Sequence, residues 1–316
     1  MNLPLFLSDL YQRGVRLSAD GDRLRCQAPT GVLTAAVTAE LQRRKQEILE
    51  LLGAAHAVAH QPAIVPLQPR GTRPAVFAIA GHNGDVFAYR ELVDALGPDQ
   101  PFFGLQPPGL DAGSAPLASV ADLAAYFAAQ IVAFDRGGPH IIAGYCAGGT
   151  IAFELAQQLA HRGVGVGFVA MFGCPYPRAF SQASRMRRRL RGYVRSYRAL
   201  EKGLDKYRYV RESMRRRTAR PAAPEETDPV LRRRAMLEQT TLAAILDYRP
   251  VPFSGRLDLF LPCREWALDF QTHHWRRFAA EVHEYEGPAG CEMPTMLRAP
   301  HHALFARFLQ TASTRR

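Results

Sequence analysis

The sequence has few cysteines and no long hydrophobic run. The first feature argues against a disulfide-rich protein and the second against a membrane-spanning one. Its five cysteines, at positions 26, 146, 174, 263 and 291 of 316 residues, are odd in number and contain no C-x-x-C pair. Such a set favours a reducing compartment over a disulfide framework and gives little support for a metal site. No run of about 18 apolar residues indicates a transmembrane helix, and the first residues lack the pattern of a signal peptide. We therefore expect a cytoplasmic protein with no membrane partner and no metal.

The net charge of +11 is unevenly spread along the chain. Residues 185–234 hold 18 Lys and Arg against 6 Asp and Glu, a local balance of +12, so the remaining sequence is close to neutral. Such a basic segment has three interpretations: it binds nucleic acid, it binds an acidic protein, or it is a solvated face of a helix. Because no nucleic-acid-binding motif accompanies the charge, we expect no nucleic acid partner.

Residues 1–52 read as a small unit of their own. The sequence predicts a helix, then a hairpin around Asp20–Gly21, then an amphipathic helix from Leu33 that ends at Gly53. The pattern GV-x-L-x₃-GDRLR-x₂-AP-x-G-x-LT resembles the TubC-type N-terminal docking domains of nonribosomal peptide and polyketide assembly lines. This resemblance implies a small α+β docking domain that binds an upstream megasynthase subunit; the alternative is a cap that only stabilises the chain. Residues 53–63 are predicted to be a linker.

From Ile64 onward, apolar runs alternate with helical patterns up to the C-terminus. This alternation predicts an α/β domain over residues 64–316, with a mostly parallel sheet and helices on both faces. The arrangement is that of the α/β-hydrolase fold. Residues 178–246 interrupt it with basic helical sequence, which we interpret as a helical lid inserted between strands.

The stretch HIIAGYCAGGT, residues 140–150, has the form of a nucleophile elbow. Gly144 and Gly148 flank Cys146 at the point where an apolar strand would turn sharply into a helix. Serine is the usual residue at such an elbow, whereas a thiol is already partly ionised at neutral pH. We expect the N-terminus of the following helix to lower the pKa of Cys146 further, and the backbone N–H of Ala147 to stabilise an oxyanion.

Four stretches, FGLQPPGLD, SVADLAAYFAAQI, GPHIIAGYCAGG and LDYRPVPFSGRLDLF, resemble the thioesterase domains that terminate nonribosomal peptide and polyketide synthases. The resemblance runs from about Ile64 to Leu309. It implies that an acyl chain passes from the phosphopantetheine of a carrier protein to Cys146, and that the protein needs no cofactor of its own. It also implies a second oxyanion donor, the backbone N–H of His82 in the loop AGHNGD.

The acid expected from the resemblance is missing. In many such thioesterases an aspartate lies 27 residues after the nucleophile, and here that position is Gly173. A carboxylate after the following strand is the usual alternative, and FLPCREWALDF offers Glu265 and Asp269 there. Each of the two is equally well explained as a surface residue.

The histidine expected from the resemblance is missing as well. The family motif Gly-x-His-x-x-Met-Leu corresponds to GCEMPTML, which puts Glu292 or Met293 at the histidine position. The nearest substitutes are His301 and His302 at the start of the last helix. We rank them above His273 and His274, and His283 on the last strand is a further candidate; these five assignments stay open.

Three hypotheses follow from an intact elbow without the family acid and base. In the first, Cys146 accepts an acyl or peptidyl group and passes it to an amine, thiol or carbon nucleophile, or cyclises it. A thioester on Cys146 remains activated for such acceptors. In the second, a relocated histidine supports hydrolytic release or editing. In the third, the fold is catalytically degenerate and only binds carrier protein. We favour the first, with an acidic carrier protein attracted by the basic lid.

Overall fold

The computed structural model describes residues 15–20, 23–28, 32–46, 48, 63–109, 115–134, 136–184, 186–187 and 229–315. The chain divides into two compact units, residues 1–62 and residues 63–316, and each is considered by itself. The first predicted helix, most of the linker, the end of the second helix and most of the basic lid lie outside the described residues.

The N-terminal unit contains a two-stranded antiparallel sheet and a helix. Strand β1 (Arg16–Asp20) pairs with β2 (Arg23–Gln27), as predicted for a hairpin around Asp20–Gly21. Helix α2 (Ala35–Arg43) begins after Thr34, whose hydroxyl accepts a hydrogen bond from the N–H of Val37 at 3.3 Å, so Thr34 caps the helix. Val15, Leu41 and Ile48 are buried between sheet and helix.

The second unit is built on a seven-stranded sheet with the order β3-β5-β4-β6-β7-β8-β9. Only the edge strand β3 is antiparallel to its neighbour; the other strands run parallel. The strands are β3 (Ile64–Gln68), β4 (Val76–Ile79), β5 (Phe102–Leu105), β6 (His140–Tyr145), β7 (Val166–Phe172), β8 (Phe253–Leu261) and β9 (Ala279–Glu286). Their near-continuous apolar sequence reflects burial on both faces.

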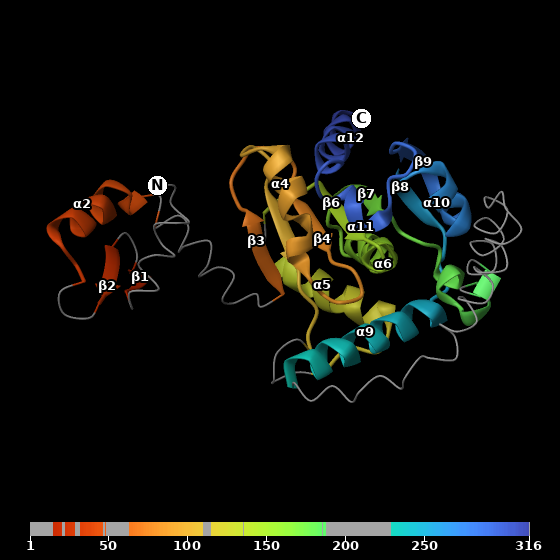
Figure 1. The fold of residues 1–316 in the computed structure, drawn as a ribbon, viewed down its shortest axis with the longest axis horizontal. Coiled ribbons are helices and arrows are strands. Elements are labelled where there is room, and N and C mark those ends of the chain that lie inside the picture. Colours follow the sequence, from red (N-terminus) through yellow and green to blue (C-terminus); the bar gives the residue numbers. More distant parts are fainter. Residues whose placement is uncertain are drawn as a thin grey trace, which may run out of the picture. The chain divides into compact units, whose positions relative to one another are not determined.

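Helices cover both faces of this sheet (Figure 1). On one face α4 packs against α12, and their apolar residues join the buried side chains of the central strands. On the other face α5 packs against α6, and α9 contacts α5. The helices are η1 (Val86–Tyr89), α4 (Arg90–Leu96), α5 (Val120–Phe134), α6 (Gly148–His161), η2 (Pro177–Phe180), α9 (Pro229–Asp247), α10 (Arg264–Asp269), η3 (Thr272–Arg277), α11 (Met293–Met296) and α12 (His302–Thr314).

The α/β-hydrolase architecture predicted from the sequence is confirmed, with a mostly parallel sheet between two helical layers. The edge strand β3 and the short helices α10, η3 and α11 were not predicted as separate elements. Of the predicted lid, the structure describes its two ends, η2 with the residues just after it, and α9. No helix in the described part of the chain is long and apolar enough to span a membrane.

Candidate active site

The elbow places Cys146 at a strained position between β6 and α6. Its φ of 53° lies in the left-handed region that non-glycine residues seldom adopt, and its N–H donates to the carbonyl of Phe172 on β7 at 2.9 Å. A Cβ at Gly148 would meet the carbonyl oxygen of Ala80, and one at Gly144 would meet the backbone of the first turn of α6. Both glycines are therefore required for the tight passage of the chain, as the elbow motif predicted.

The environment of the Cys146 thiol differs from the expectation. The residue is only 4% exposed, and this burial raises the pKa of its thiol to about 11, although the N–H of Ala147 acts in the opposite direction. The predicted lowering by the N-terminus of α6 is present in the N–H of Ala147, but the loss of solvent around the sulfur outweighs it, so the expected net lowering of the pKa is wrong. At neutral pH Cys146 is therefore mainly a thiol.

The loop after β4 lies against the elbow. A Cβ built on Gly81 would be 3.7 Å from the Cβ of Cys146, so the backbone that leads into His82 passes directly beside the nucleophile. The N–H of Gly84 donates to the carbonyl of Gly81 at 3.0 Å, which closes the turn. Neither the N–H of His82 nor that of Ala147 donates to a backbone carbonyl among the described residues. Both remain our candidate oxyanion donors.

The position of the family acid contains no carboxylate and no space for one. Gly173 follows β7 with a φ of 51°, and a Cβ at this position would lie 2.8 Å from Cγ of Met293 and 2.8 Å from Sδ of Met296. Met293 itself stands at one of the two positions assigned to the family histidine. Its carbonyl accepts a hydrogen bond from the hydroxyl of Tyr145, the residue before Cys146, at 2.9 Å. Methionine side chains thus fill the space that an acid and a base would share.

Glu292 and the two histidines of the C-terminal segment lie at the ends of helices α11 and α12, and the buried Nδ1 of His302 has no hydrogen-bond partner among the described residues. Glu292 caps α11, with its carboxylate and the Thr295 side chain forming a capping box. His302 faces helix α4, where its Nδ1 is 3.9 Å from Glu91, whose carboxylate also accepts the N–H of Ala299 at 2.6 Å. His301 is the half-buried residue just before α12. No hydrogen bond joins any of these side chains to Cys146 in the described structure.

The other predicted acids and histidines lie on elements beyond β7. Glu265 is exposed and Asp269 is half-buried on α10, which follows β8. His283 on β9 pairs with Glu281 at 2.7 Å and with the guanidinium of Arg315 at 3.2 Å. His273 and His274 lie in η3, with their rings in contact.

One pair of ionisable side chains near the elbow was missed at the sequence level. Nε2 of His82 is 3.0 Å from Oε1 of Glu238, which lies on α9. The sequence marked His82 only for its backbone N–H, and Glu238 was one of several charged residues in a basic segment. No spacing in the sequence joins them, because the contact forms only when α9 returns to the loop after β4.

Cys174, Cys263 and Cys291 lie at the same end of the sheet of the second unit. Cys174 is 2% exposed beside Gly149 in the first turn of α6, and its burial raises the pKa of its thiol. Cys263 and Cys291 are also buried, after β8 and β9. Among the described residues no group of three or more His, Cys, Asp or Glu side chains could hold a metal ion.

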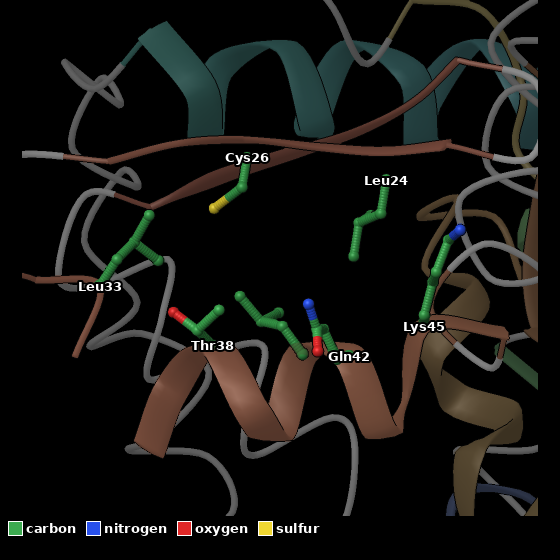
Figure 2. A pocket seen from close by; sticks show the side chains of 7 residues that line it. Leu24, Cys26, Leu33, Thr38, Gln42 and Lys45 are labelled. Atoms are coloured by element: carbon green, nitrogen blue, oxygen red, sulfur yellow. The ribbon is translucent and has the colours of Figure 1, made fainter. Parts of the chain in front are cut away.

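The N-terminal unit has a pocket of its own, of about 400 Å³ (Figure 2). It opens between β2 and α2, with Leu24 and Cys26 on one side and Leu33, Thr38 and Gln42 on the other. Leu33 is 41% exposed, which is high for a large apolar side chain.

Comparison with known proteins agrees with these two units. Residues 74–288 match the sequence model of the thioesterase domain. The chain belongs to this family. Residues 5–53 match the TubC N-terminal docking domain, so the predicted resemblances are both confirmed. Membership indicates hydrolase or acyl-transfer chemistry.

The related proteins are large synthases, and this chain matches a short part of each. A stretch of 115 residues is 33% identical to the polyketide synthase PksR of Bacillus subtilis (strain 168), and 140 residues are 34% identical to chondramide synthase cmdD of Chondromyces crocatus. These stretches cover 36% and 44% of this chain but only 4% and 3% of the two synthases. The chain therefore corresponds to a small part of each relative.

Solved thioesterase domains share the fold. The Vlm2 thioesterase domain bound with a dodecadepsipeptide aligns with a TM-score of 0.56 at 23% identity, over 79% of this chain and 98% of that one. The NocB thioesterase domain, in a covalent complex with a fluorophosphonate nocardicin G analogue, aligns with a TM-score of 0.58 at 18% identity, over the same shares. At these identities the likeness concerns the fold alone.

Proposed function

We propose that this protein takes an acyl or peptidyl group from a carrier-protein thioester onto Cys146 and transfers it to a nucleophile other than water. The observation that carries the proposal is the elbow itself: Cys146 holds a strained, positive φ beside two N–H groups that donate to no backbone carbonyl among the described residues, and the positions of the family acid and histidine hold other residues. Strain of this kind persists where the surrounding structure maintains it, and functional sites are where it concentrates.

Apolar side chains lie where the family acid and histidine are expected, and this supports acyl transfer over hydrolysis. Met293 and Met296 occupy the space beside Gly173, so the family acid and histidine are not available at their own positions to activate water. A thioester on Cys146 is close in energy to the carrier thioester, because one carbon–sulfur bond replaces another. It therefore keeps its reactivity toward an amine, a thiol or a carbon nucleophile, or toward an internal group that cyclises the chain.

The N-terminal unit supports the view that this protein binds a megasynthase subunit. We propose that the pocket between β2 and α2 receives a segment of the upstream subunit, which brings the acyl-loaded carrier protein close to Cys146. Tethering raises the effective concentration of the carrier at the active site without any new catalytic contact. The phosphopantetheine arm then belongs to the partner, and a small-molecule acceptor enters separately.

Intact-protein mass spectrometry tests the proposal directly. The full chain and its Cys146→Ala variant are mixed with acyl-loaded carrier protein, and we expect an acyl adduct on the wild-type chain only. Addition of candidate amines should then remove the adduct faster than buffer does. Steady-state hydrolysis as fast as that of serine thioesterases would contradict transfer, and carrier binding without an adduct would favour a binding-only module.

A further inference from the structure

The His82 imidazole is held in one orientation by a carboxylate. Its Nε2 is 3.0 Å from Oε1 of Glu238, while its Nδ1 is buried and has no hydrogen-bond partner among the described residues. A carboxylate this close to Nε2 favours the tautomer in which Nε2 carries the proton and Nδ1 carries the lone pair. The ring therefore presents a free basic nitrogen inside the protein, and a buried nitrogen without a partner calls for an explanation.

Packing keeps the helix that carries Glu238 in place, although the Glu238 side chain is itself 45% exposed. The neighbouring Leu237 is 1% exposed and Thr241 is 5% exposed, so this face of α9 is buried. Just beyond the end of the helix, the hydroxyl of Tyr248 donates to the carboxylate of Glu154 on α6 at 2.8 Å. Because α6 is the helix that starts at the elbow, α9 and the elbow are tied to the same element.

The backbone just before His82 lies beside the nucleophile. His82 directly follows Gly81, whose backbone packs on Cys146, with 3.7 Å between the two Cβ positions. Cys146 needs a base there: its thiol is protonated at neutral pH, and the positions of the family acid and histidine hold Gly173 and Met293. A general base that takes the proton during attack removes this obstacle.

We propose that His82, oriented by Glu238, is the general base that serves Cys146. This assignment rests on the proposed function, since it supplies the proton transfers of that reaction. The proton of the Cys146 thiol moves to Nδ1 as sulfur attacks the thioester carbonyl. The bond from that carbonyl to the phosphopantetheine sulfur breaks, and the departing thiolate takes the proton from Nδ1. When an amine then attacks the Cys146 thioester, Nδ1 accepts the amine proton and returns it to the Cys146 sulfur. Glu238 is a positioning residue.

The test measures how fast Cys146 is acylated by an N-acetylcysteamine thioester, with the full chain and rapid-quench mass spectrometry. His82→Ala keeps the backbone N–H of the loop, so only the imidazole is lost. We expect it to slow acylation by about 10²-fold or more, the usual contribution of a general base. Added imidazole should restore part of the rate, and Glu238→Gln should cause a smaller loss that imidazole does not repair.

Matched variants separate a chemical role from a structural one. His161→Ala removes an exposed histidine at the end of α6 and should leave the rate unchanged. An unchanged rate in His82→Ala, or a loss that imidazole fails to restore, overturns the assignment to His82 while the acyl-enzyme stands. An equal loss in His302→Ala that imidazole restores would transfer the role to that residue. A wild-type chain that forms no adduct overturns the proposed function together with this assignment.

Discussion

Gly173 and Met293 share one small space next to the elbow, so that a Cβ on Gly173 would lie 2.8 Å from Cγ of Met293. By the resemblance described above, these two positions belong to the acid and, in one of its two alignments, the histidine of an ordinary thioesterase. Their replacements contact each other, and Met296 completes the apolar filling. The two losses therefore form one packed arrangement, and restoring a single residue would not restore a triad.

Gly173→Asp should consequently destabilise the protein without increasing hydrolysis. We expect the free energy of unfolding to fall by about 1–3 kcal/mol, because the new side chain overpacks against two methionines. Urea denaturation of the variant and wild type measures this loss. Gly290→Asp is a matched control: Gly290 also has a positive φ, 80°, but nothing lies within 4 Å of its Cβ position. Equal losses in the two variants would mean that backbone strain, not packing, sets the cost.

The elbow was predictable from the sequence because its geometry is local. Gly144, Cys146 and Gly148 lie within five consecutive residues, and the clashes that require glycine involve the same turn and the adjoining strand. The alternation of strands and helices was equally visible, since buried parallel strands leave continuous apolar runs. The docking unit could be recognised because its hairpin and capped helix are encoded in short motifs.

The chemistry of the site was less predictable because it depends on distant segments. The pKa of Cys146 is set by burial, which requires the whole fold, and not by the helix that starts beside it. The pair of His82 and Glu238 joins a loop to a helix far along the chain. Short elements such as α11, where Glu292 serves as a cap, carry too little periodicity to be predicted.

The buried thiol of Cys146 makes stability depend on pH. Its pKa is about 11 in the folded protein, whereas an unfolded cysteine ionises near about 8.5. Between these values the folded state holds a proton that the unfolded state has lost, so stability falls as pH rises. Relative to Cys146→Ser, the wild-type chain should lose up to about 1.4 kcal/mol per pH unit from about pH 9 toward 11.

Urea unfolding of the two proteins at several pH values, under reducing conditions, gives this difference. All other titrating groups are common to both chains, so their effects cancel. A difference that stays constant from pH 8 to 10.5 would show that folding does not shift the pKa of Cys146. A difference that changes in favour of the wild-type chain over pH 8 to 9 would show that Cys146 is already ionised in the folded protein, where the thiol would not need a base.

Leu33→Asp should weaken docking without affecting the second unit. Leu33 lines the pocket of the N-terminal unit and is 41% exposed, so a carboxylate there disturbs the binding surface more than the fold. Calorimetric titration with the carrier-bearing C-terminal part of the upstream subunit should show at least a tenfold weaker Kd, about 1.4 kcal/mol. Acylation of Cys146 by a small thioester should be unchanged.

Val132→Asp is the control for Leu33→Asp, since Val132 is 47% exposed on α5 of the second unit. It introduces the same charge at a similarly exposed apolar position and should leave the Kd unchanged. If both variants weaken binding equally, the effect is one of net charge. If neither does, the partner binds elsewhere.

Asp258 on β8 should be essential for stability although it lies outside the site. It is fully buried and accepts two hydrogen bonds from Arg256, at 2.8 and 2.7 Å. The guanidinium also donates to the carbonyls of Ala312 and Arg315, so it joins the sheet to the end of α12. Asp258→Asn leaves this cation buried without its counter-charge, which costs about 3–5 kcal/mol in comparable pairs.

The exposed pair of Arg276 and Glu284 is the matched comparison for Asp258→Asn. It has the same two-point geometry, at 2.7 Å for both contacts, but Arg276 is 61% exposed. Glu284→Gln should therefore cost less than about 1 kcal/mol, since water and salt screen such pairs. Urea denaturation of both variants tests whether burial decides the loss in the free energy of unfolding. If both losses are small and similar, water solvates Arg256 once its partner is neutral. Acylation of Cys146 should persist in whatever fraction of Asp258→Asn stays folded, because Asp258 contributes no group to the elbow.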